Sequence, residues 1–131
     1  MVLTLDRALE IVHSIVRAGQ SKGLPIAVSV VDTGGRVIAA ARSERAGYIN
    51  LEVAQKKAVT AVNFGAPTKA VLEMIEGEAF LLAAVMKESE LSLIPGGFPI
   101  RIEGELVGGL GIAGARYTDD HAIGQQVLEG L

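Results

Sequence analysis

The amino-acid sequence predicts a single α/β domain in which helices cover both faces of a mainly antiparallel sheet. Two pairs of β-rich segments are each separated by a short turn that contains glycine, so hairpins rather than parallel crossovers join the strands. Segments with helical periodicity flank both pairs. The chain has 131 residues, half of them apolar, which is enough for one buried core. We therefore expect residues 1–131 to form one domain.

The first half of the chain predicts a helix, a hairpin and a second helix. From Thr4 to about Lys22, apolar residues recur at three- and four-residue spacing, which is typical of an amphipathic helix. The segments PIAVSVVD and RVIAAAR then flank the turn TGG, where the Asp32 carboxylate can bond the turn backbone. A second helix is expected over Ile49–Phe64, and Gly65 should end it.

The second half predicts shorter elements, beginning with a helix over Lys69–Glu76 that Thr68 would cap. Residues 77–93 have helical propensity at first and alternate later, which favours a short helix and then a connector. The remaining expected elements are a strand at Phe98–Ile102, a turn at 103–105, a strand from Leu106 to about Gly114, and a helix from Thr118 toward Leu128.

The strands predict a sheet with one bulky face and one small face, because side chains alternate between faces. The bulky positions are Ile26, Val28, Val30, Leu110 and Ile112, and they alternate with Ala27, Ser29, Val31, Gly109, Gly111 and Ala113. A helix, a ligand or a partner subunit must therefore lie close to the small face.

Composition excludes several classes of partner. A net charge of −3 leaves no basic patch for nucleic acid, and no run of Lys or Arg suggests a membrane surface. The chain has no cysteine, which excludes disulfides and thiolate metal sites. The N-terminal segment MVLTLDRALE does not read as a signal peptide, so a cytoplasmic location is expected.

No catalytic or metal site is predicted from the residues. The segment GLGIAG at 109–114 matches the nucleotide-binding pattern GxGxxG, but it falls within a strand rather than at a strand-to-helix turn. His13 and His121 are far apart in sequence, and no carboxylate cluster with ligand spacing accompanies either. Both are expected at the surface or its edge, although a neutral imidazole can bind haem iron. No paired general acid and base is evident.

Two basic regions are candidates for binding a carboxylate. Arg101 is a charged residue in a largely apolar strand. It is either a solvated residue paired with a nearby glutamate or a guanidinium that binds a carboxylate through two hydrogen bonds. Lys56 and Lys57 lie in the middle of a helix, where one of them must point nearer the sheet than the other.

Three segments in this order resemble the GlcG/HbpS family, which includes the C-terminal domain of PduO-type proteins. They are VVDTGGRVIA, KKAVTAVNFGAPT and PGGFPIRIEGELVGGLGIAGA, and the resemblance runs from about Leu3 to Leu128. It implies a profilin-like α/β/α sandwich with a five-stranded antiparallel sheet, and assembly into dimers or larger rings. It also implies haem as a cofactor, since some members of the family bind haem, but it supplies no shared iron ligand that can be placed here.

The leading hypothesis is a cytoplasmic homo-oligomeric accessory protein that binds a small molecule or haem. Its ligand-binding residues would be Lys56, Gly96, Gly97, Phe98 and Arg101, with Lys56 or Arg101 gripping an acidic group. One alternative is an enzyme that acts on a small carboxylate or aldehyde-derived metabolite, with the same cations as electrostatic groups. Another is a structural subunit that has no ligand.

Overall fold

The computed structural model describes all 131 residues and contains five helices and four strands. In chain order these are α1 (Leu5–Ser21), β1 (Ala27–Asp32), β2 (Val37–Arg42), α2 (Ile49–Phe64), α3 (Thr68–Ile75), α4 (Ala79–Met86), β3 (Gly97–Ile102), β4 (Glu105–Ala113) and α5 (Tyr117–Glu129). The strands form one antiparallel sheet in the order β2-β1-β4-β3. The two hairpins therefore lie side by side, with β1 against β4.

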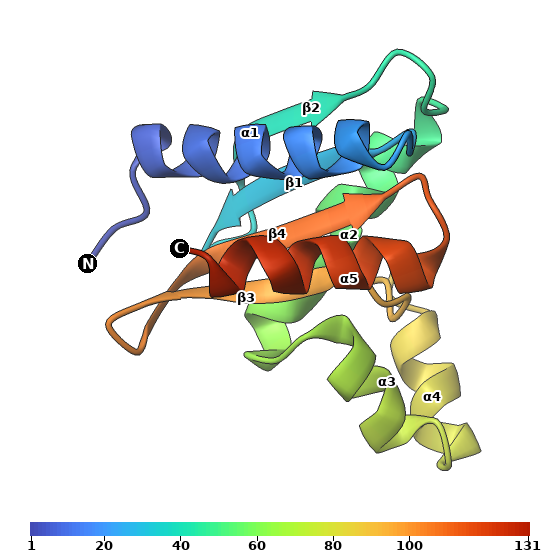
Figure 1. Ribbon diagram of the computed structural model, residues 1–131. Coiled ribbons are helices and arrows are strands. Elements are labelled where there is room, and N and C mark those ends of the chain that lie inside the picture. The colour runs from blue at the N-terminus through green and yellow to red at the C-terminus, as the bar shows by residue number, and fades with distance from the viewer.

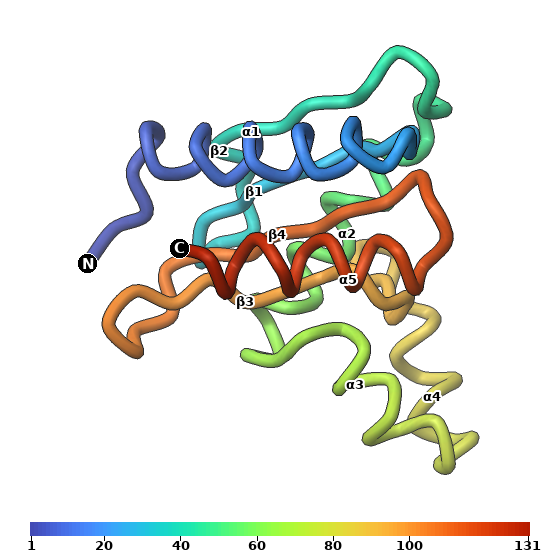
Figure 2. The backbone as a smooth tube through the Cα atoms, viewed as in Figure 1, coloured from blue at the N-terminus to red at the C-terminus, as the bar shows by residue number.

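The sheet lies between two helical layers, as Figure 1 shows. Helices α1 and α5 cover one face, and α2 covers the other. The tube in Figure 2 shows that α3 and α4 extend beyond the β3 side of the sheet, away from α1. None of the helices is both long enough and apolar enough to cross a membrane.

The bulky face of the sheet forms the main core beneath α1 and α5. Burying these side chains provides most of the driving force for folding, at about 25 cal/mol per Å² of apolar surface. The core includes Val28, Val30, Leu110 and Ile112 from the sheet, Ile11 and Ile15 from α1, and Ile123 from α5.

The small face of the sheet packs directly against the backbone of α2. A Cβ atom on Gly111 would overlap the carbonyl oxygen of Ala54, and one on Gly109 would overlap that of Ala58. Both helix residues are fully buried alanines, so neither partner contributes a bulky side chain. The predicted close approach is confirmed, and the helix of the same chain makes it.

The expected five-stranded sheet is wrong in its strand count, because the sheet has four strands. Residues 91–95 do not form another strand, because their backbone bonds to side-chain hydroxyls. The Ser92 N–H donates to Thr60 Oγ1 at 2.8 Å, and the Ile94 carbonyl accepts from Thr68 Oγ1 at 2.9 Å. This segment therefore does not pair with a strand of the sheet.

Two helices start one residue earlier than predicted. Thr68 is the first residue of α3 rather than its cap, and its hydroxyl is used by the 91–97 segment, whose Gly97 N–H donates to it at 2.9 Å. The last helix begins at Tyr117 without a side-chain cap. At the start of α1, Thr4 Oγ1 accepts from the Arg7 N–H and caps the helix. The Asp32 turn is confirmed as well, because its carboxylate accepts from the Gly34 and Arg36 N–H groups.

Candidate functional site

The glycines before β3 lie in the interior, between the sheet and α2. Gly96 has a φ of 127°, a conformation that favours glycine, and a Cβ there would lie 2.6 Å from the Ile112 carbonyl oxygen. A Cβ on Gly97 would overlap the Lys57 carbonyl oxygen. Both positions therefore serve close packing of the protein on itself, and neither presents its backbone to a cavity.

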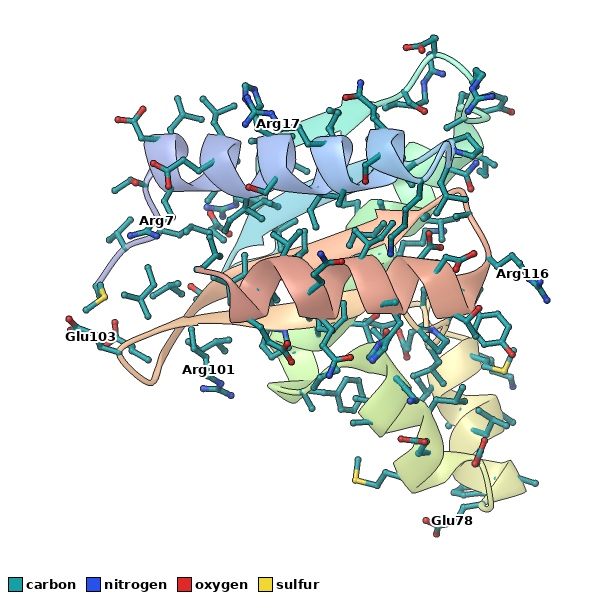
Figure 3. All side chains as sticks on the ribbon, in the orientation of Figure 1. Arg7, Arg17, Glu78, Arg101, Glu103 and Arg116 are labelled. Carbon is teal, nitrogen blue, oxygen red and sulfur yellow. The ribbon has the colours of Figure 1, made fainter.

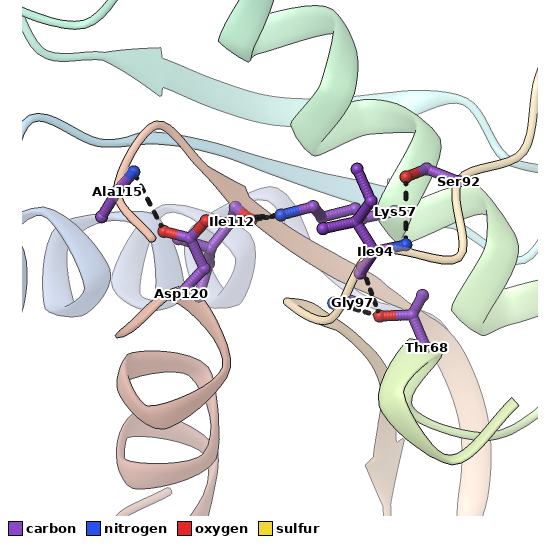
Figure 4. Close-up of polar contacts among 8 residues, drawn as sticks. All are labelled: Lys57, Thr68, Ser92, Ile94, Gly97, Ile112, Ala115 and Asp120. Carbon is purple, nitrogen blue, oxygen red and sulfur yellow. Dashed lines mark hydrogen bonds and ion pairs between the residues drawn. The ribbon is translucent and has the colours of Figure 1, made fainter. Parts of the chain in front are cut away.

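A buried ammonium group occupies the space beside Gly96. The Lys57 Nζ donates to the Ile112 carbonyl at 2.7 Å and lies 3.4 Å from Asp120 Oδ2 (Figure 4). The other carboxylate oxygen, Oδ1, accepts from the Ala115 N–H at 3.3 Å. One polar network thus ties α2 to the end of β4 and to the first turn of α5.

Burial sets the electrostatics of this network. It lowers the pKa of Lys57 and raises the pKa of Asp120, and the attraction between the two charges opposes both shifts. Each side chain is only 2% exposed. With no access to solvent, the pair holds three elements together and cannot itself contact a ligand.

Lys56, the lysine predicted to bind a ligand, lies on the outer side of α2. It lines a polar cleft of about 410 Å³ between α2, the β1–β2 turn and residues 89–90, together with Glu52 and Glu90. No ion pair joins Lys56 to either glutamate. The helical spacing could have separated the two lysines, because Lys57 shares a face with the small residues Ala54, Ala58 and Ala61, whereas Lys56 does not.

Arg101 lies at the other end of β3 from the glycines and is exposed. Its guanidinium donates to the Gly65 carbonyl at 3.0 Å, and Figure 3 shows the side chain extending away from the body of the fold. The Arg101 side chain thus ties β3 to the end of α2. The five residues predicted as one ligand site are distributed over four places and do not share a cavity.

Phe98 is the predicted site residue that lies next to a histidine. Its ring centroid is 5.0 Å from that of His121, with the planes tilted by 30°. Both residues line a hollow of about 370 Å³ between α3 and α5, which we call the His121 hollow. Lys69 and Glu73 of α3 also line it.

His121 is half-buried, and its Nδ1 is buried without a hydrogen-bond partner. Burial lowers the pKa of His121, the charge of Lys69 lowers it further, and the charge of Glu73 opposes both effects. The imidazole is therefore neutral at pH 7 and able to bind a metal. From the sequence, His121 is expected at the surface or its edge and is not among the expected ligand-binding residues, because nothing in the sequence shows that α3 packs beside α5.

A further hollow of the molecule is apolar. It measures about 520 Å³ and lies between α3, α4 and the segment 91–95, at the start of α5. We call it the apolar groove. It is lined by Leu72, Leu82, Val85, Met86, residues 91–95 and Tyr117.

Residues 3–129 match the model of a family described as haem degrading protein HbpS-like. The chain belongs to the HbpS-like family. This confirms the GlcG/HbpS resemblance seen in the sequence, which the GlcG protein of Escherichia coli K12 also supports. GlcG is 26% identical over 115 residues, which are 86% of this chain and 82% of GlcG.

The chain is also similar to a PduO sequence and to a solved PduOC structure. The corrinoid adenosyltransferase PduO of Salmonella typhimurium is 28% identical over 123 residues, which are 93% of this chain but only 37% of PduO. A solved structure of a PduOC:heme complex matches with a TM-score of 0.90 and 26% identity, over 100% of this chain and 96% of that one. The HbpS-like chain described here thus shares its α/β fold with the protein of that complex. In this chain the fold has four strands and five helices.

Proposed function

We propose that this chain is a haem-binding accessory protein in which His121 provides the iron ligand. Membership of the HbpS-like family and the likeness to the PduOC:heme complex support haem as the cofactor. The observation on this chain that carries the proposal is the neutral His121 imidazole that lines its hollow. Because Nδ1 is buried, Nε2 is the nitrogen that would bind the iron. A cytoplasmic location stays a prediction.

The residues around His121 include several groups that haem binding needs, beside the carboxylates of Glu73 and Glu129. A porphyrin needs an apolar surface, an iron ligand and cations for its propionates. Phe98 and Leu128 supply apolar surface, and Lys69 supplies a positive charge on the α3 side. Bound haem would supply a redox-active iron, while the chain holds the imidazole in place and covers part of the macrocycle.

The iron ligand can be tested by titrating the protein with haemin and following the Soret band. His121→Gln is expected to weaken haemin binding at least tenfold and to change the Soret position, because it removes the imidazole. His13→Gln is the matched control, since His13 is exposed on α1. Loss of binding in His13→Gln with His121→Gln unaffected would move the site to α1.

The same titration has an expected pH dependence. Protons compete with iron for the imidazole, and the pKa of His121 lies below its ordinary value of 6.5. Haemin affinity of the parent should therefore stay level as the pH falls to about 6.5 and drop only below it. An affinity that already falls steeply between about pH 8 and 7 would argue against a neutral, half-buried histidine as ligand.

We also propose that copies of the chain assemble through α4, whose sequence is AFLLAAVM. A helix that is apolar on all sides is ordinarily buried, yet no residue of α4 is buried in the single chain. Phe80 is 89% exposed. A partner subunit was one of the neighbours expected for the glycine-rich face of the sheet, but α2 already covers that face. The exposed α4 helix is therefore the interface we propose.

Assembly can be measured by light scattering at micromolar concentration. The parent is expected to have a mass of at least twice 13.6 kDa, and Phe80→Ser should shift it toward the single chain. Tyr48→Ser is the control, because Tyr48 is also a strongly exposed aromatic residue but precedes α2. A parent of 13.6 kDa, or equal effects of both substitutions, would contradict the α4 interface.

A further inference from the structure

The apolar groove has one fixed wall and one loosely held wall. Its floor is the segment 91–95, which hydrogen bonds from Ser92 to Thr60 and from Thr68 to Ile94 tie to α2 and α3. Figure 4 shows part of this attachment. The opposite wall is α4, which contributes Leu82 and Val85 and buries none of its residues. The groove is therefore formed before anything enters it, with α4 held on α3 through Leu82 and Val85.

The lining of the groove carries no charge. Eight of its ten residues are hydrophobic, and the polar side chains are the hydroxyls of Ser92 and Tyr117. Because an ionised group loses its hydration in such surroundings without gaining a partner, a charged ligand is disfavoured. An apolar ligand is favoured, since it removes apolar surface from water on both sides.

The size and shape of the groove favour a small molecule over a second copy of the chain. Its volume of about 520 Å³ falls within the range of small-molecule pockets, roughly 300–1,000 Å³. Of the α4 side chains that line it, Leu82 and Val85 are half-buried and Met86 is exposed, whereas Phe80 and Leu81 are exposed and do not line it. A neighbouring copy would cover the outer side chains and leave the groove to be filled.

We propose that the apolar groove binds an uncharged, largely apolar small molecule that has no more than one or two hydrogen-bonding groups. Ser92 and Tyr117 are the groups that would orient it. The site is distinct from the His121 hollow, which has charged residues on its walls, so this inference does not depend on haem binding.

The probe for this test is N-phenyl-1-naphthylamine, a neutral dye whose fluorescence rises in apolar surroundings. The parent is expected to bind it saturably with one site per chain. Leu82→Asp should weaken binding at least tenfold, because it places a charge in the groove. Leu82→Trp fills the groove without adding charge and should weaken binding to a similar degree, which keeps the test valid if the aspartate variant loosens α4.

Two control variants separate the groove from the other surfaces. Phe80→Ser should lower the oligomer mass but leave dye affinity within about twofold, and His121→Gln should leave dye binding unchanged. Full dye binding in both Leu82 variants would overturn the proposal. So would loss of dye binding in Phe80→Ser, since the dye would then report on the interface between copies. Absence of saturable binding to the parent would also overturn it.

Discussion

Gly111→Ala is expected to destabilise the protein by about 3 kcal/mol or more, and to prevent folding if α2 cannot move. The new Cβ would overlap the Ala54 carbonyl oxygen and lie 2.8 Å from the Ala58 backbone nitrogen. Both clashing groups are backbone atoms in the middle of a helix, so no change of side-chain rotamer can relieve them. Urea unfolding followed by circular dichroism measures the loss, which should also lower Tm by on the order of 10 °C.

Gly77→Ala is the matched control for this prediction. Gly77 is exposed between α3 and α4, and a Cβ there would meet nothing within 4 Å. Its free energy of unfolding should stay within about 0.5 kcal/mol of the parent value. If Gly111→Ala were as mild as Gly77→Ala, the close packing of α2 on the sheet would be refuted.

Lys57→Met is expected to lower the free energy of unfolding by about 3–5 kcal/mol, because it leaves the Asp120 carboxylate buried without its partner. The double variant Lys57→Met/Asp120→Leu should recover much of this loss, since it removes both charges and keeps apolar volume. Urea unfolding of the two single variants and the double variant gives the coupling energy directly. Strictly additive losses would show that the two groups do not interact.

The pH dependence of Lys57→Met follows from the remaining carboxyl group. Burial already raises the pKa of Asp120 in the parent, and removing the nearby ammonium raises it further. A carboxyl group with a raised pKa binds more protons in the folded state, so its contribution to stability falls as the pH rises through that pKa. The variant should therefore lose less stability, relative to the parent, near pH 4 than near pH 7. An equal loss at both values would mean that Asp120 does not titrate in the folded variant.

Most of the fold could be predicted because it depends on local patterns. The helix Ile49–Phe64 was predicted with its observed bounds, since Gly65 ends it in a left-handed conformation at a φ of 64°. The alternation of large and small residues in β1 and β4 correctly indicated which face needed a close neighbour. The expected fifth strand came from the family resemblance and not from these patterns.

The candidate site was harder to predict because it depends on contacts between distant segments. Lys57 and Asp120 are 63 positions apart, and an acid in the first turn of a helix is sufficiently explained by the helix dipole. Arg101 has the chemistry of a carboxylate fork, but its partner proved to be a backbone carbonyl. The ring contact between Phe98 and His121 joins β3 to α5. The sequence shows the order of these two elements along the chain, but it does not show that they pack together.

The direct packing of α2 on the sheet makes the two sides of the sheet unequal in how they accept change. Beneath α1 and α5 the neighbours are side chains, so volume can be exchanged between positions such as Ile11 and Leu110 and the core can repack. Beneath α2 the neighbours of Gly109 and Gly111 are carbonyl groups, which cannot rearrange without moving the helix. Diversification of this scaffold, by evolution or by design, is therefore open on one side of the sheet and restricted on the other, most strictly at Gly109 and Gly111.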